Sequence, residues 1–385
     1  MSRARSPPAL DDDDLLPEIL LRLPLQPSSL PRASLVCKRW RSVASDPAFS
    51  RRFRRHHRRN PPLLGLFRVE YNPHVELRFE PSLGAPNRIS PERLSWRGNE
   101  YAGCYHPLGC RHGLVLILDT TQKQVLVWDP VTGDQHRVAI PPGFQQLVRT
   151  LPSGAVLRGA AGDGDHFQVV LVGYGEEQIT QVLGCVYSSE TGAWGDLIST
   201  SVRSKDIVAS MDKPAVLVGD SLYWLLHPDG ILEFDLDSKR LSVIPLPVEL
   251  DLVSSSLLFS VIRADSGGLG FLLLSGFNAQ LWERKTGSDG VTSWVLERTI
   301  EIDSLLPLDY AEEGGPPVIL AYAEENNTAL MLGVGHRGGL FMIQLKSFKF
   351  EKLLRNNNLD YFHLFESVYT AETCIGGGAG LLHST

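Results

Sequence analysis

The chain has 385 residues, 43% hydrophobic and 21% charged, which is an ordinary composition for a folded soluble protein. No apolar run approaches the roughly 20 residues of a membrane-spanning helix, and the first fourteen residues lack the apolar core of a signal peptide. The cysteines are scattered and odd in number, which indicates free thiols and a cytoplasmic or nuclear location: Cys37, Cys104, Cys110, Cys185 and Cys374.

The charge is unevenly distributed along the chain. Residues 1–60 carry 13 Lys and Arg against 6 Asp and Glu, whereas the remainder carries 24 against 38. A basic segment followed by an acidic one predicts two modules with different partners.

The first predicted element is a short helix that follows the acidic run Asp11–Asp14. Carboxylates at a helix start accept unpaired backbone N–H groups and complement the helix dipole. Pro17 fits the first turn, and Pro24 ends the helix. The apolar residues recur at the spacing of one helix face: Leu15, Leu16, Ile19, Leu20 and Leu23.

A second amphipathic stretch runs from Leu35 to Val43, with Val36, Trp40 and Val43 at helical spacing. Asp46 and Pro47 end it. These segments could form a small helical bundle that packs only on itself. So few residues bury little apolar surface, however, and an apolar face left open predicts a partner.

Residues 16–24, 32–41 and 46–49 together resemble the F-box motif in order, spacing and residue type. In that family the motif folds as three helices and binds a Skp-family adaptor, which holds the cullin of a ubiquitin ligase. Pro31 departs from many relatives and is expected in the first turn of its helix. The resemblance implies that the adaptor is contacted by Leu16, Pro17, Ile19, Leu20, Leu35 and Trp40. The alternative role of packing the helices together is assigned to Leu23, Val36 and Val43, and the sequence does not separate the two roles because both faces are apolar.

The run Arg51–Arg59 is the densest charge cluster of the chain. It favours a solvated helix or linker that ends at Asn60, Pro61 and Pro62. A nuclear import signal and a nucleic-acid surface are alternatives. The acidic remainder of the chain argues against nucleic acid as the main partner.

From Leu63 onward, strand patterns alternate with turns, and helical periodicity is almost absent. Repeated strand–turn–strand units spaced by about 40 to 65 residues predict an irregular β-propeller or kelch-like array. A β-sandwich of stacked sheets is the alternative. The units end in aromatic residues that we interpret as signature positions: Trp128, Trp194, Phe234, Trp282 and Phe341.

Residues 110–116, 127–133, 187–194 and 219–224 resemble the propeller-type associated domain of plant F-box proteins. The resemblance covers most of residues 100–355 and implies a mainly β protein with an N-terminal F-box. We predict a disordered N-terminus (1–10), an F-box (11–50), a basic helix or linker (51–62), a propeller-like domain (63–370) and a flexible C-terminus (371–385).

The sequence gives little support for chemistry. Cys104, His106, Cys110 and His112 have metal-ligating side chains, but their spacing does not predict a zinc site. Paired carboxylates such as Glu324 and Glu325 are interpreted as solvated turns, and no G-x-S-x-G nucleophile motif occurs. We expect no cofactor and no metal.

Three functions remain open at this point. The resemblance favours a non-catalytic substrate receptor of a Skp–cullin–F-box ubiquitin ligase, with an unknown protein target held by the propeller. A scaffold that binds the adaptor without ubiquitin transfer is the second. A propeller enzyme is the third, and it would need carboxylates or a metal converging on a central cavity.

Overall fold

The computed structural model describes residues 15–58, 60–71, 73–101, 104–144, 152–159, 166–174, 181–202, 213–226, 230–248, 256–303, 305, 315–334, 339–354 and 361–370. The predicted disordered N-terminus, the acidic run Asp11–Asp14 and the predicted flexible C-terminus lie outside these residues. Within the described residues, no helix combines the length and apolarity needed to cross a membrane.

The N-terminal module consists of short helices: α2 (Leu15–Leu21), α3 (Ser29–Ser34), α4 (Lys38–Ala44) and α5 (Pro47–His57). Pro17 and Pro31 each occupy the third position of a helix, where a missing N–H costs no hydrogen bond. Asp46 caps the start of α5, and its carboxylate accepts a hydrogen bond from the Ala48 N–H at 3.0 Å.

The prediction of one amphipathic helical stretch over Leu35–Val43 is wrong for its first residues. Helix α3 ends at Ser34 and α4 begins at Lys38, so Leu35 and Val36 lie in the connection between the two helices. Three consecutive apolar residues, Leu35, Val36 and Cys37, cannot all face one side of a helix, because helix positions turn by about 100° per residue.

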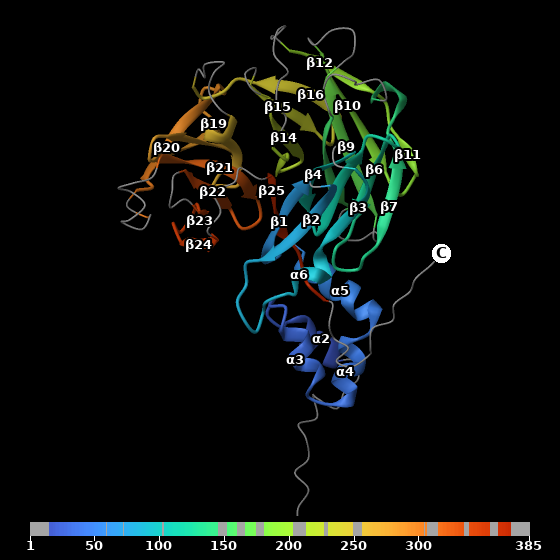
Figure 1. Cartoon of the computed structure of the whole chain (residues 1–385). Helices are drawn as coiled ribbons and strands as arrows, with labels where there is room; N and C mark the ends of the chain where they lie inside the picture. Colours follow the sequence, from blue (N-terminus) through green and yellow to red (C-terminus); the bar gives the residue numbers. More distant parts are fainter. Residues whose placement is uncertain are drawn as a thin grey trace, which may run out of the picture.

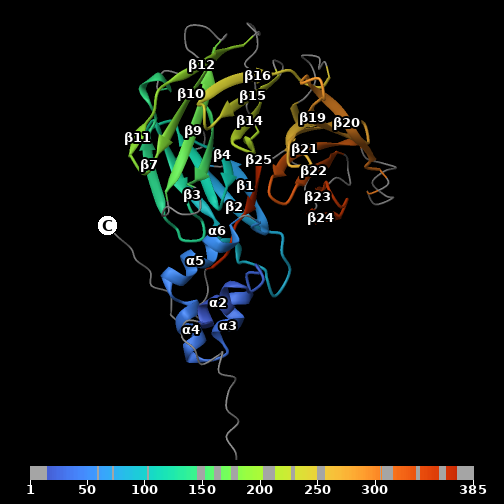
Figure 2. The same ribbon diagram turned by 180° about the vertical axis from the view of Figure 1, so that it is seen from behind.

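The β-domain is a six-bladed propeller of antiparallel sheets (Figures 1 and 2). This confirms the propeller prediction, and the alternative of a β-sandwich is wrong. Three sheets hold β4 (Tyr105–Arg111), β5 (Leu114–Asp119), β6 (Gln124–Trp128) and β7 (Gln135–Ala139); β8 (Ser153–Arg158), β9 (Phe167–Tyr174), β10 (Gln181–Ser188), β11 (Ala193–Trp194) and β12 (Ile198–Ser201); and β13 (Val216–Val218), β14 (Ser221–Leu226), β15 (Gly230–Asp235) and β16 (Arg240–Ile244).

The remaining sheets include the one that closes the ring. They hold β17 (Phe259–Arg263), β18 (Leu269–Ser275), β19 (Asn278–Thr286) and β20 (Thr292–Glu301); β21 (Gly315–Ala323), β22 (Thr328–Val334), β23 (Leu340–Gln344) and β24 (Phe350–Leu354); and β25 (Tyr361–Glu366), β1 (Leu63–Tyr71), β2 (His74–Pro81) and β3 (Trp96–Tyr101). Short helices α6 (Pro91–Leu94), η1 (Pro142–Phe144) and η2 (Ser256–Leu258) lie in connections.

The propeller is closed by its C-terminal strand. Strand β25 pairs antiparallel with β1, with Phe67 opposite His363 and Val69 opposite Tyr361. The closing sheet therefore takes its inner strand from the end of the domain and its other strands from the beginning. This pairing joins the end of the domain to its beginning, so backbone hydrogen bonds hold the ring closed.

Six buried apolar clusters hold the ring together, one between each pair of neighbouring sheets. The predicted signature aromatics take part in them. Trp128, Phe234 and Phe341 are buried members of three clusters, while Trp194 and Trp282 are partly buried against two others. These side chains therefore pack one blade against the next. This shared packing role explains why an aromatic residue recurs in each predicted unit.

Local turn chemistry explains the motif at residues 127–133. The Asp129 Oδ1 accepts hydrogen bonds from the N–H groups of Val131 and Thr132 at 3.0 and 3.2 Å, and Gly133 N–H donates to the Asp129 carbonyl. Gly133 has a φ of +82°, a conformation that favours glycine. The turn aligns β6 with β7.

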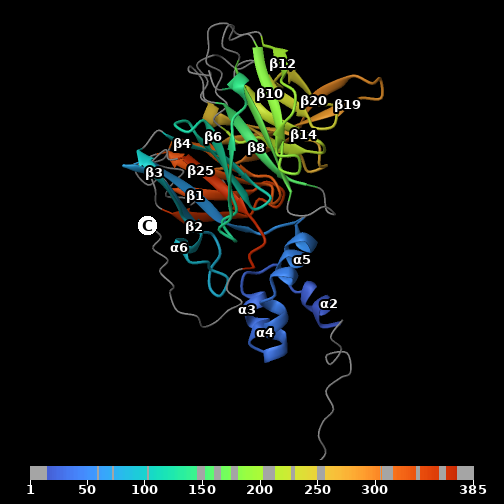
Figure 3. The ribbon, with the colours of Figure 1, turned by 90° about the vertical axis from the view of Figure 1, so that its right-hand side faces the viewer.

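The helical module lies at the end of the propeller where the inner strands finish (Figure 3). Strands β4, β8 and β17 end at Arg111, Arg158 and Arg263, and β25 ends at Glu366. Val368, just after β25, packs into the apolar core of the helices. Charged residues thus gather at the end of the axis that faces the helical module.

Candidate functional site

The structure separates the six predicted adaptor-binding residues into two groups. Leu16 and Leu20 are fully buried in the core of the helical module, so within this chain they hold the helices together. The others are at least partly accessible: Pro17, Ile19 and Trp40 are half-buried and Leu35 is exposed. Their role in binding an adaptor stays a prediction.

Leu35 and Val36 form an exposed apolar pair between α3 and α4. Their exposed fractions are 59% and 62%, high for large aliphatic side chains. Val36 was predicted to pack the helices together, and the structure places it in solvent instead. Leu23 and Val43, which were given the same role, do pack against the helical core. Leu35 and Val36 therefore form an apolar surface that a partner could contact, between α3 and α4.

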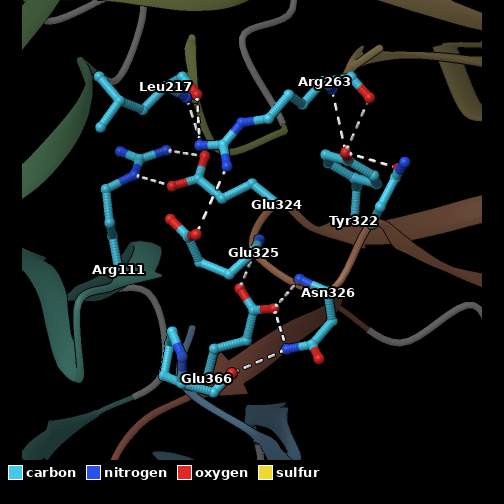
Figure 4. Close-up of polar contacts among 10 residues, drawn as sticks. Arg111, Leu217, Arg263, Tyr322, Glu324, Glu325, Asn326 and Glu366 are labelled. Carbon is cyan, nitrogen blue, oxygen red and sulfur yellow. Dashed lines mark hydrogen bonds and ion pairs between the residues drawn. The ribbon is translucent and has the colours of Figure 1, made fainter. Parts of the chain in front are cut away.

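The second feature is a polar network at the propeller axis (Figure 4). Arg111, at the end of β4, donates from Nε and Nη2 to the two carboxylate oxygens of Glu324 at 2.5 and 2.8 Å. The same Nη2 donates to the Ala215 carbonyl, and the Leu217 N–H donates to Glu324 Oε2 at 2.8 Å. Burial alone would raise the pKa of Glu324, but the charge and hydrogen bonds of Arg111 outweigh it and hold the pKa below its ordinary value.

Arg263 extends the network to the sheet of β17. Its Nη2 donates to the Leu217 carbonyl at 2.9 Å, and its Nη1 lies 3.4 Å from Glu325 Oε2. The Tyr322 hydroxyl accepts from the Arg263 N–H at 3.0 Å and donates to Asn327 Oδ1 at 2.9 Å. These contacts join three inner strands of the ring.

Glu366 joins the closing strand to the same network. Its Oε1 accepts from the backbone and side-chain nitrogens of Asn326 at 2.7 and 2.6 Å, and its Oε2 accepts from the Glu325 N–H at 3.2 Å. Burial raises the pKa of Glu366 to about 7, although these donors favour the charged form. Asn326 also donates to the Pro61 carbonyl at 3.0 Å, which ties the network to the segment before β1.

A small cavity lies beside this network on the axis. Its volume is about 30 Å³, room for about two water molecules, and Arg111, Ser260 and Glu366 are among the residues that line it. His363, which is buried, also lines it and has no hydrogen-bond partner at Nδ1. Burial lowers the pKa of His363 to about 4, so the ring is neutral at pH 7.

The interpretation of Glu324 and Glu325 as a solvated turn is wrong. Glu324 is 8% exposed, and both carboxylates face arginines from other sheets. The missed signal is that Arg111 and Arg263 end buried strands, where a charged side chain needs a partner. Arg111 pairs with Glu324 and Arg263 pairs with Glu325, so these ion pairs connect the sheets at this end of the ring.

The cysteine and histidine cluster has structural contacts. Cys110 packs against an apolar cluster, and the His112 Nδ1 accepts a hydrogen bond from the Arg158 N–H at 3.2 Å. Across the part of the chain that the structure describes, no three His, Cys, Asp or Glu side chains are grouped so that they could hold a metal ion.

Comparisons with known proteins follow the division into two modules. The family model described as "F-box protein AT5G49610-like, beta-propeller" matches residues 107–309, more than half of the chain, and the model described as "F-box-like" matches residues 13–56. F-box protein At5g03970 from Arabidopsis thaliana is 27% identical over 259 residues, 63% of this chain and 59% of that protein. The chain thus covers less than two thirds of the length of this curated relative.

Similar solved structures include apo AztD from Citrobacter koseri and the PQQ-bound aldose sugar dehydrogenase of Streptomyces coelicolor. AztD is 13% identical with a TM-score of 0.39, covering 78% of this chain and 88% of that chain. The dehydrogenase is 15% identical with a TM-score of 0.37, covering 71% and 91%. At these values the likenesses carry no conclusion about function.

Proposed function

This chain belongs to the family of F-box proteins with an AT5G49610-like β-propeller, and from that premise we propose that it is the substrate-recognition subunit of a Skp–cullin–F-box ubiquitin ligase. The F-box binds a Skp-family adaptor, and the propeller captures a protein target. One observation supports this most: the F-box-like helices carry the exposed apolar pair Leu35 and Val36 while they are fixed to one end of the propeller.

The proposed adaptor contact centres on Leu35 and Val36. Two large aliphatic side chains exposed side by side favour burial against a partner, at about 25 cal/mol for each Å² removed from water. Pro17, Ile19 and Trp40 contribute through their accessible parts. Leu16 and Leu20 act indirectly, because they hold α2 against the other helices.

The proposed mechanism is positioning. The propeller holds a target near the ubiquitin carrier bound by the ligase, which raises the effective concentration of target lysines. That requires a firm connection between the modules. Arg58, just after α5, supplies part of it by donating to the carbonyls of Gly159 and Arg158, both at 2.8 Å. The chemistry of ubiquitin transfer belongs to the partner subunits.

The enzyme alternative finds little support at the axis. Of the carboxylates that converge there, Glu324 and Glu325 face arginines, and Glu366 accepts hydrogen bonds from Asn326 and the Glu325 N–H. The cavity of about 30 Å³ is far smaller than the roughly 300–1,000 Å³ of typical ligand pockets.

The test is co-expression of the full chain with a Skp-family adaptor, followed by pull-down. We expect Leu35→Asp combined with Val36→Asp to abolish the complex while circular dichroism stays that of the wild type. Leu197→Asp combined with Val291→Asp is the matched control, because it places the same two charges at exposed aliphatic side chains of the propeller. A wild-type chain that binds no adaptor would overturn the proposal.

Ubiquitin transfer separates the receptor from the scaffold. In a reconstituted ligase containing this chain, we expect ubiquitin conjugates that disappear with the Leu35 and Val36 changes. Adaptor binding without any conjugates on the chain or on a captured protein would favour the scaffold.

A further inference from the structure

The basic run contains one face made of arginines. Arg51, Arg54, Arg55 and Arg58 follow the spacing i, i+3, i+4 and i+7 along α5 and its last turn, so they lie on one side of the helix. Phe53 lies on another side and is buried in the helical core. The run is therefore not a uniformly solvated helix.

This arginine face forms one wall of a pocket between α5 and the propeller. The other wall includes His112, Asp129 and Arg158, and Pro61, Ser367 and Val368 complete the lining. The pocket has a volume of about 60 Å³, room for about four water molecules. Figure 1 shows α5 between the other helices of the module and the propeller.

The charges that line this pocket do not balance. Five arginines face one carboxylate, Asp129. That carboxylate is already engaged: its Oδ2 accepts from Arg158 Nη2 at 2.6 Å and lies 3.6 Å from Arg54 Nη1, while its Oδ1 accepts from two backbone N–H groups. The Arg54 Nη1 is buried and makes no hydrogen bond, since 3.6 Å exceeds hydrogen-bond length.

The crowding of positive charge also affects its neighbours. Burial and the charge of Arg158 lower the pKa of Arg58 to about 10. Burial, together with the charges of Arg111 and Arg58, lowers the pKa of His112 to about 3. His112 is thus neutral, and because its Nδ1 accepts from the Arg158 N–H, its proton lies on Nε2.

We propose that the pocket between α5 and the propeller binds a small phosphate-bearing anion, with Arg51, Arg54 and Arg55 as the principal ligands. Guanidinium groups match phosphate oxygens in paired hydrogen bonds, and several arginines around one site favour an anion with more than one charge. The anion offsets the repulsion of the like-charged pairs Arg51–Arg55 and Arg54–Arg58, which are four residues apart.

A small anion is favoured over a nucleic acid. The pocket lies between the two modules and has room for one phosphoryl group with its oxygens, while the exposed side chains of Arg51 and Arg55 are free to hold a second phosphoryl group outside it. Residues 61–385 carry 24 Lys and Arg against 38 Asp and Glu, so the surface beyond the pocket repels a long polyanion. The anion bridges α5 to the propeller and stabilises their junction.

The test measures binding of inorganic pyrophosphate and inorganic phosphate to the full chain by isothermal titration calorimetry, and the thermal midpoint by differential scanning fluorimetry. Sodium chloride at equal ionic strength serves as the reference, because general screening acts on all exposed charges. We expect pyrophosphate to bind with one site and to raise the midpoint by several degrees, with phosphate weaker by at least tenfold.

The variants locate the site. Arg51→Gln combined with Arg55→Gln removes two exposed side chains that make no contact within the core, so the fold is retained, and we expect at least tenfold weaker binding. Arg54→Gln gives a similar loss. Arg52→Gln is the matched control: it lies on the same helix, pairs with Glu18 and does not line the pocket, so binding stays within twofold of the wild type.

Three results would overturn the proposal. The first is no binding of pyrophosphate by the folded wild type at millimolar concentration. The second is equal weakening by Arg52→Gln and by the Arg51 and Arg55 changes, which would indicate a diffuse field. The third is binding of single-stranded RNA but not of pyrophosphate, which would make the arginine face a nucleic-acid surface.

Discussion

Arg111 and Glu324 are 213 positions apart in the chain and form a buried bidentate ion pair that joins the end of β4 to the turn after β21. The side chains are 6% and 9% exposed, so solvent screens the pair weakly. Around it, Glu325, Arg263 and Glu366 bring further inner strands to the same end of the axis. On the side of the F-box, buried ion pairs and hydrogen bonds therefore hold the ring closed together with the apolar clusters between the sheets.

Glu324→Gln keeps the shape of this side chain but removes its charge. Arg111 then stays buried without a counter-charge, and we expect the free energy of unfolding to fall by about 3–5 kcal/mol, measured by urea denaturation. Glu297→Gln is the control, since the Lys285–Glu297 pair is exposed and should contribute less than about 1 kcal/mol. Equal effects of the two changes would contradict a stabilising role of the axial pair.

Removal of β25 should destroy the propeller. A chain that ends at residue 355 lacks the partner of β1 and loses buried side chains from two of the inter-sheet clusters, including Phe362 and Phe365. We expect no cooperative melting transition by circular dichroism. A chain that ends at Thr370 keeps every described strand and should melt cooperatively. A cooperative melt of the shorter chain would show that the ring closes without β25.

Leu20 and Leu35 should have opposite roles in the F-box. Leu20→Ala opens a cavity in the helical core, and we expect a loss of about 2–5 kcal/mol in the local free energy of unfolding. Leu35→Ala removes an exposed side chain and should cost less than about 0.5 kcal/mol. Hydrogen exchange of the α2 and α5 peptides measures both values. Equal protection in the two variants would contradict this division.

His363 should make stability depend on pH. Its pKa is about 4 in the folded chain against an ordinary 6.5, so below pH 6.5 the unfolded chain binds more protons and stability falls. Between pH 7.5 and pH 5 this residue should cost about 2 kcal/mol. His363→Gln should remove that part of the acid sensitivity, measured by urea denaturation at both pH values.

Glu366 acts in the opposite direction, because a folded pKa raised to about 7 strengthens the fold as the pH falls through 7. It is present in both the wild type and the His363→Gln variant, so their difference isolates the histidine. His136→Gln is the control, since His136 is exposed. An unchanged acid dependence in the His363 variant would contradict the prediction.

Local sequence determined much of this protein. Short helices, their prolines and the turn at Asp129–Gly133 depend on contacts between residues a few positions apart, which a single sequence displays. The aromatic positions, one in each repeated unit, predicted the blades because each blade meets the same need to pack on its neighbour. The F-box resemblance likewise rests on spacing within one short segment.

Tertiary structure alone decided which groups face each other. Nothing near Glu324 in the sequence identifies Arg111 as its partner, and the buried turn therefore looked solvated. The same holds for the closure by β25, for the exposure of Val36 and for the arginine face of α5 against the propeller. Burial and charge pairing depend on residues that the fold brings together from distant parts of the chain. A local sequence pattern does not specify them, because the environment of a side chain is set by its neighbours in space.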